Sequence, residues 1–84
     1  MYEIIISDLA RKQLRKLDRN VQTRIFDALE KIRVRPEAFV KKLVGEDEYR
    51  LRVGDYRVIM DIDHGRLLVI VIKVGHRKNI YDKL

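Results

Sequence analysis

Five residues in the carboxyl-terminal half of the chain have the side chains that a phosphodiester-binding site needs. They are Arg50, Arg52, Arg57, Arg77 and Tyr81. A guanidinium is planar, stays charged at any accessible pH and binds phosphate oxygens through two parallel hydrogen bonds. A tyrosine adds a phenol that ionises more easily amid cations and a ring on which a base can stack. These residue types in one short stretch point to a site that handles phosphodiesters.

The spacing of the arginines predicts that three of them share a β-hairpin. Side chains alternate along a strand, so Arg50 and Arg52 project from one face and the residues between and beside them fill a core. Gly54-Asp55 suits the two-residue turn that closes a hairpin. That turn brings Arg57 back beside the first two arginines.

A third strand is predicted over residues 67–74, which are apolar on both faces apart from Lys73 and are typical of a central strand. It follows a second turn at His64-Gly65, and His76 and Arg77 come after its far end. Whether that end reaches the arginines of the hairpin depends on the order of strands in the sheet, which the sequence leaves open. The convergence of these residues on one site is a hypothesis.

The amino-terminal half predicts one strand and two helices. Residues 2–6 are a β-branched run, and Ser7 is a suitable helix N-cap. Apolar residues at helical spacing predict a first helix and a second one, which begins around residues 18–20 and ends at Pro36. The short connection predicts an antiparallel helix pair on one face of the sheet. We therefore expect an α+β fold over residues 1–84: an N-terminal strand, a two-helix hairpin, a mainly antiparallel four-stranded sheet and a short C-terminal segment.

Composition favours a polyanionic partner. The chain has 19 Lys and Arg against 13 Asp and Glu, a net charge of +6 and a pI near 9.8. It has no cysteine, hence no disulfide and no thiol nucleophile, which fits a reducing compartment. The longest apolar run, residues 67–72, is too short to span a bilayer, and no secretory signal is visible at Met1. We expect a cytoplasmic protein that does not enter the membrane.

A second group of cations lies on the predicted helix pair. Its members are Arg11, Lys12, Arg15, Lys16, Arg19 and Arg24. The ordinary interpretation is a solvated helix face. The functional interpretation is a docking surface for structured RNA, in which lysines and arginines contact phosphates without reading sequence.

Two segments carry a resemblance to a known family. YRLRVGDYRVI at residues 49–59, followed by an apolar strand and VGHRKNIY at residues 74–81, resembles the RelE branch of the RelE/ParE toxin superfamily. The resemblance spans nearly the whole chain, from the opening strand and two helices to three strands with the arginines and the tyrosine in order. It implies a RelE-like fold and the toxin of a type II toxin–antitoxin system, acting as a ribosome-dependent mRNA endonuclease. It also implies three partners: a cognate antitoxin, the ribosome and mRNA.

The resemblance implies roles for single residues. Arg57 and Arg77 match the family positions that stabilise the scissile phosphate and assist the leaving group, and Tyr81 matches a family tyrosine that handles a proton or orients a base. Arg50 and Arg52 fall where several relatives carry lysines, which keeps the charge but leaves the general base open. The reaction implied is attack by the RNA 2′-hydroxyl on the adjacent phosphate, with no metal and no other cofactor.

Several alternatives stay open. His76 is a possible acid or base, because histidine titrates near neutral pH and some relatives use a histidine nearby. If the strand continues, the alternation of side chains directs His76 away from Arg77. His64 lies in a predicted turn and is expected to be simply exposed. Arg50, Arg52 and Tyr81 have ordinary structural interpretations as solubilising charges and a packing aromatic. At the level of function, the alternatives are a ParE-like inhibitor of DNA gyrase and a noncatalytic basic RNA-binding module.

Overall fold

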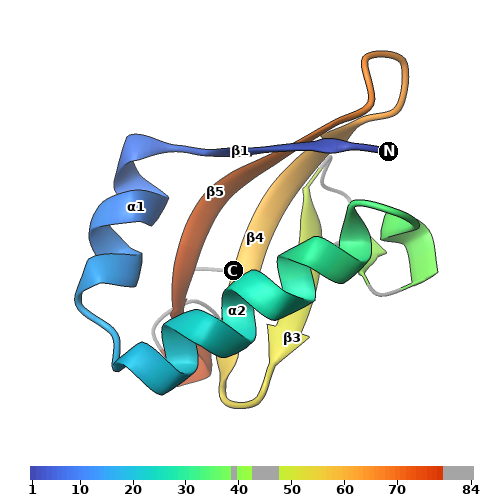
Figure 1. Cartoon of the computed structure of the whole chain (residues 1–84). Helices are drawn as coiled ribbons and strands as arrows, with labels where there is room; N and C mark the ends of the chain where they lie inside the picture. The colour runs from blue at the N-terminus through green and yellow to red at the C-terminus, as the bar shows by residue number, and fades with distance from the viewer. Residues whose placement is uncertain (39, 43–47, 79–84) are drawn as a thin grey trace.

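A mixed β-sheet with two helices over one face forms the described part of the chain (Figure 1). The computed structural model describes residues 1–38, 40–42 and 48–78, with only the backbone of Lys41 and Lys42. The elements are β1 (Glu3–Ile6), α1 (Asp8–Arg15), α2 (Arg19–Ile32), the 3₁₀ turn η1 (Pro36–Ala38), β2 (Lys41–Lys42), β3 (Tyr49–Val53), β4 (Tyr56–Asp63) and β5 (Leu68–His76).

The strand order in the sheet is β1-β5-β4-β3-β2. β1 runs parallel to β5, and every other neighbouring pair is antiparallel. The α+β fold with a mainly antiparallel sheet is therefore confirmed. The sequence did not predict the two-residue strand β2, because so short and charged a segment has no alternation to read. β2 lies at the edge of the sheet, next to β3, and β4 lies between β3 and β5.

Ser7 links the first helix to the sheet. Its backbone is extended at φ −64° and ψ 160°, and its Oγ accepts a 3.1 Å hydrogen bond from the amide of Ala10. This geometry confirms the predicted N-cap. The same hydroxyl donates to the carbonyl oxygen of Ile72 in β5 at 2.9 Å. One side chain thus fixes both the start of α1 and its position against the sheet.

The two helices diverge from their short connection and cover different strands (Figure 1). α1 lies along β5, and α2 runs across the sheet. The hydrogen bonds along the edge of β5 explain why α1 lies beside this strand. β1 pairs with β5 only as far as Val71, so the next part of that edge needs other partners. Ser7 supplies one for Ile72, and Oε1 of Gln13 accepts a 2.7 Å hydrogen bond from the amide of Val74.

The core lies between the helices and one face of the sheet. α1 and α2 contribute Ala10, Leu14, Ile25, Leu29 and Ile32, and the sheet contributes Leu51, Val53, Val58, Met60, Ile62, Val69, Val71 and Val74. The register between β4 and β5 shifts at Ile59/Met60, where the paired residues of β5 are Lys73 and Val71. The extra residue, Ile72, is a bulge that reverses the alternation. As a result Val71 and Val74 both face the core, while Lys73 is exposed.

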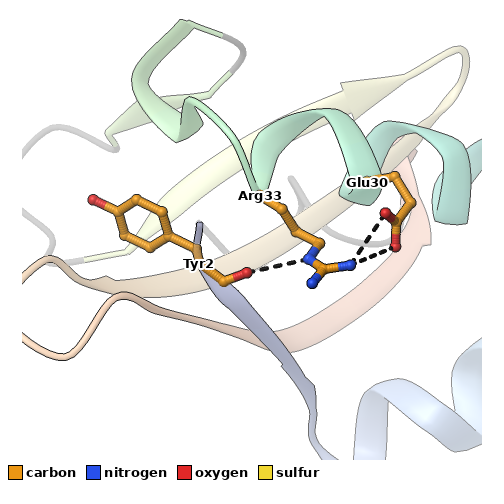
Figure 2. A network of polar contacts seen from close by, with 3 residues as sticks. All are labelled: Tyr2, Glu30 and Arg33. Atoms are coloured by element: carbon orange, nitrogen blue, oxygen red, sulfur yellow. Dashed lines mark hydrogen bonds and ion pairs between the residues drawn. The ribbon is translucent and has the colours of Figure 1, made fainter.

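The start of β1 is fastened to the end of α2. The amide of Tyr2 donates to the carbonyl oxygen of Arg33 at 2.8 Å, and Nε of Arg33 donates back to the carbonyl oxygen of Tyr2 at 3.2 Å. Figure 2 shows that the same guanidinium also reaches the carboxylate of Glu30, at 3.2 Å. The first strand therefore enters the sheet from a fixed point on the helix.

Candidate active site

One row across the sheet joins arginines from two strands. Arg52 of β3 lies directly opposite Arg57 of β4, and Arg57 lies opposite Gly75 of β5. Because β4 separates β3 from β5, the end of the third predicted strand comes within one row of the hairpin arginines. The strand order that the sequence left open is the one that lets these residues converge.

Arg77 is held beside the same turn by its backbone. β5 ends at His76, and the amide of Arg77 donates a 2.9 Å hydrogen bond to the carbonyl oxygen of Asp55. Asp55 belongs to the two-residue turn between Arg52 and Arg57. Three of the predicted arginines are therefore grouped around one turn, and we call Arg52, Arg57 and Arg77 with Gly54-Asp55 the turn cluster.

Arg57 is the one buried charged side chain among the described residues, with 4% of its surface exposed. Its Nη1 donates to the carbonyl oxygens of Gly54 at 3.0 Å and Tyr56 at 2.9 Å. These bonds hold the guanidinium against the turn. A positive charge oriented in this way before a substrate arrives is what electrostatic stabilisation of a transition state requires.

The two arginines of β3 differ in position. Arg52 is exposed and pairs with Arg57, whereas Arg50 is half-buried, pairs with Ile59 and Lys41, and lies two residues farther from the turn. The structure brings Arg52 into the turn cluster and places Arg50 farther along the same face. Tyr81 lies outside the described residues.

His76 faces the other side of the sheet from the turn cluster. The bulge at Ile72 puts it in phase with Val74, on the face that the helices cover. Its ring packs edge-on against Tyr56 with centroids 5.5 Å apart, and its Nδ1 accepts a 3.3 Å hydrogen bond from the amide of Lys78. The backbone turns directly after His76, so alternation along the strand does not extend to Arg77.

The helix cations do not all share one surface. Arg11, Lys12, Arg15, Lys16 and Arg19 are exposed on α1, the connection and the start of α2. Arg24 is exposed as well, but its guanidinium reaches the sheet: a Cβ added at Gly54 would lie 2.8 Å from Nη2 of Arg24. No local pattern relates residue 24 to residue 54, so the sequence offered no signal for this contact.

Two pairs of oppositely charged side chains lie at the ends of α2 and β4 that are remote from the Gly54-Asp55 turn. Arg33 pairs with Glu30 at 3.2 Å and Arg66 with Asp63 at 3.8 Å, at the ends of α2 and β4. His64 is exposed, as expected from its place in the turn. Its Nδ1 also lies 2.8 Å from the hydroxyl of Tyr2 and 3.3 Å from a carboxylate oxygen of Glu37. At this end of the molecule, polar contacts therefore connect the turn between β4 and β5 to the start of the chain and to η1.

The turn cluster has a different electrostatic character. Within the described ranges, no ion pair joins Arg24, Arg52 or Arg77 to a carboxylate. Cations gathered at one end of the molecule create a positive potential that attracts an anion. The arrangement can bind a phosphodiester through several guanidinium groups. Among the described residues, neither helix has the length and apolar character of a membrane span.

Comparisons with known proteins place the chain in a family. The family model described as the ParE toxin of the type II toxin–antitoxin system parDE matches residues 4–81. No protein with a curated description matches the chain.

Solved structures of RelE toxins share the fold. A chain from the RelBE2 toxin–antitoxin complex of Mycobacterium tuberculosis has a TM-score of 0.83 and 26% identity, covering 90% of this chain and 98% of its own. A chain from the intact RelBE complex of E. coli has a TM-score of 0.77 and 31% identity, covering 90% and 96%. The isolated E. coli RelE toxin has a TM-score of 0.78 and 25% identity over the full length of both chains. The chain therefore belongs to the RelE/ParE superfamily of type II toxin–antitoxin toxins.

Proposed function

We propose that this toxin is a ribosome-dependent endonuclease that cleaves mRNA and thereby inhibits translation. The observation that carries the proposal is the grouping of Arg52, Arg57 and Arg77 around the Gly54-Asp55 turn, with Arg57 held by two carbonyl oxygens. The three arginines come from β3, from β4 and from the residue after β5, and they are not part of the hydrophobic core. They suit a phosphate that gains charge during a reaction.

The proposed reaction is a transesterification within the RNA strand. The 2′-hydroxyl loses its proton to a base and its oxygen bonds to the adjacent phosphorus. The bond from phosphorus to the 5′-oxygen breaks, and that oxygen takes up a proton. The products are a 2′,3′-cyclic phosphate and a free 5′-hydroxyl.

The turn cluster and Tyr81 divide the work. Arg52 and Arg57 stabilise the charge on the phosphorane, and Arg77 assists the leaving oxygen. An arginine side chain stays protonated and is almost never a free base, so proton transfer falls to Tyr81 or to a group of the RNA. Arg50 extends the positive surface along β3. His76 is a further candidate for acid–base work, although its ring lies on the helix side of the sheet.

The proposal includes three partners. The ribosome positions the mRNA, and the exposed cations of α1 and the start of α2 contact its RNA phosphates. Related RelE toxins form complexes with RelB antitoxins. By analogy a cognate antitoxin binds this chain, and its acidic residues complement the net charge of +6.

A cell-free translation reaction tests the nuclease directly. The 5′ ends of a defined mRNA are mapped by primer extension with the wild type, Arg77→Ala, Tyr81→Phe and the control Arg66→Ala, which changes an exposed arginine at the far end of β4. We expect cuts within translated codons that require ribosomes. Each site variant should lose about a hundredfold or more in cleavage rate, as for loss of an oxyanion donor, and the control should match the wild type. Intact mRNA with wild-type protein contradicts the proposal.

A second candidate function is inhibition of DNA gyrase. The match to a ParE family model over residues 4–81 favours it. A supercoiling assay with purified gyrase separates the two candidates, because a gyrase inhibitor blocks supercoiling and leaves translated mRNA intact. RNA binding that weakens with salt, without cleavage on or off the ribosome, would instead identify a noncatalytic RNA-binding module.

A further inference from the structure

The guanidinium of Arg24 lies on the turn that carries the turn cluster. A Cβ added at Gly54 would come within 2.8 Å of Nη2 and 3.4 Å of Cζ and Nη1 of Arg24. Gly54 has a φ of +59°, which a glycine adopts without steric cost. The side chain missing at residue 54 therefore leaves the space that the end of Arg24 occupies.

Arginines from both faces of the sheet meet at Gly54. Arg57 projects from the face away from the helices, and its Nη1 binds the carbonyl oxygen of Gly54 at 3.0 Å. Arg24 comes from α2, on the helix side, and covers the Cα of the same residue. Positive charge thus continues around the end of the sheet, from the outer face to the helix layer.

The side chain of Arg24 makes no polar contact with the described part of the chain. Its side chain is exposed, and no hydrogen bond or ion pair of the described residues involves it. Of the acidic residues of α2, Glu30 pairs with Arg33, and Asp27, three residues after Arg24, forms no ion pair with it. The guanidinium of Arg24 therefore keeps its hydrogen-bond donors available to an anionic ligand at the turn, where the positive potential favours one.

We propose that Arg24 binds a backbone phosphate of the RNA strand, next to the phosphate that is cleaved. The strand then crosses the end of the sheet at Gly54 and continues over the amino-terminal half of α2. Contact with phosphate alone carries no base information, so Arg24 adds affinity and register without codon preference. This inference rests on the proposed function in two respects: the ligand is RNA, and its neighbouring phosphate is the one cleaved at the turn cluster.

Steady-state cleavage on mRNA-programmed ribosomes tests the role. The variants are Arg24→Ala, Arg24→Lys and the matched control Lys31→Ala, which removes one exposed cation from the other end of α2. We expect Arg24→Ala to raise KM about tenfold or more, the loss of one charged hydrogen-bonding contact, with kcat nearly unchanged. Arg24→Lys should recover part of the loss, and Lys31→Ala should resemble the wild type. A urea titration should show equal stability for all four proteins.

A binding measurement keeps the inference separate from the nuclease. The probe is a fluorescent single-stranded RNA with 2′-O-methyl groups, which cannot be cleaved by its own 2′-oxygen, and its affinity is measured over a range of salt. Each phosphate contact contributes about 0.7 to the slope of log affinity against log salt concentration. Arg24→Ala should lower the slope by about that amount relative to wild type and Lys31→Ala.

The outcomes are distinct. A lower slope for Arg24→Ala with no cleavage by the wild type would support the phosphate contact and overturn the nuclease. Cleavage by the wild type with Arg24→Ala equal to Lys31→Ala in both assays would overturn the contact alone. No binding of the probe by wild-type protein at low salt would also overturn the contact.

Discussion

The backbone amide of Arg77 donates a hydrogen bond of 2.9 Å to the carbonyl oxygen of Asp55. This bond places the end of β5 beside the turn between β3 and β4. The bond uses the backbone carbonyl of Asp55, and the exposed carboxylate of the same residue takes no part in it. The carboxylate is instead a negative charge beside a site that we propose for phosphate.

A first prediction follows for Asp55→Asn. The carbonyl oxygen remains, so Arg77 should keep its place, and removal of the negative charge should lower KM for mRNA on ribosomes by a few-fold. Cleavage kinetics at two salt concentrations are the measurement, because screening weakens an effect of exposed charge. A loss of cleavage as large as that of Arg77→Ala would contradict the prediction and show that the carboxylate itself is needed.

A second prediction separates Arg57 from Arg52. Arg57→Ala removes a buried guanidinium that satisfies two carbonyl oxygens, so it should destabilise the fold by about 1–3 kcal/mol. Arg52→Ala changes an exposed side chain and should alter stability by no more than about 0.5 kcal/mol. Both should reduce mRNA cleavage. Urea unfolding followed by circular dichroism gives the stabilities, and equal stabilities for the two variants would mean that the carbonyl contacts of Arg57 add nothing.

A third prediction concerns Gly54. An alanine at φ +59° should cost about 1–2 kcal/mol of stability, and an asparagine less, because asparagine adopts this conformation more easily. The new Cβ also displaces the guanidinium of Arg24, which can swing into solvent. Gly54→Ala should therefore weaken RNA binding in the wild-type background and have no further effect in an Arg24→Ala background. Additive losses of binding in the double variant would show that the two residues act independently.

A fourth prediction concerns the edge of β5. Gln13→Leu leaves the amide of the buried Val74 without its acceptor and should cost about 1–3 kcal/mol. Gln13→Glu retains an acceptor and should cost less. Hydrogen exchange of the Val74 amide, followed by NMR, reports the loss as about tenfold faster exchange per 1.4 kcal/mol. Unchanged exchange in Gln13→Leu would mean that another group satisfies this amide.

Local features of the chain could be predicted because their causes are local. Ser7 caps α1 as expected, since a cap depends on residues three positions apart. The turn at Gly54-Asp55 and the shared face of Arg50 and Arg52 follow from strand alternation and turn chemistry. The arginines and the tyrosine in order, together with the predicted strands and helices, indicated the superfamily, which the comparisons confirm. The role of Tyr81 stays a prediction.

The site itself depended on contacts between residues far apart in the sequence. Nothing local states that β4 lies between β3 and β5, yet this order brings Arg77 to Asp55. The bulge at Ile72 moves the following residues by one position, and one position decides which face His76 occupies. Arg24 meets Gly54 only because α2 crosses the sheet at that point. Sequence alone determined which side chains were available for phosphate chemistry, and packing of the whole chain decided which of them stand together.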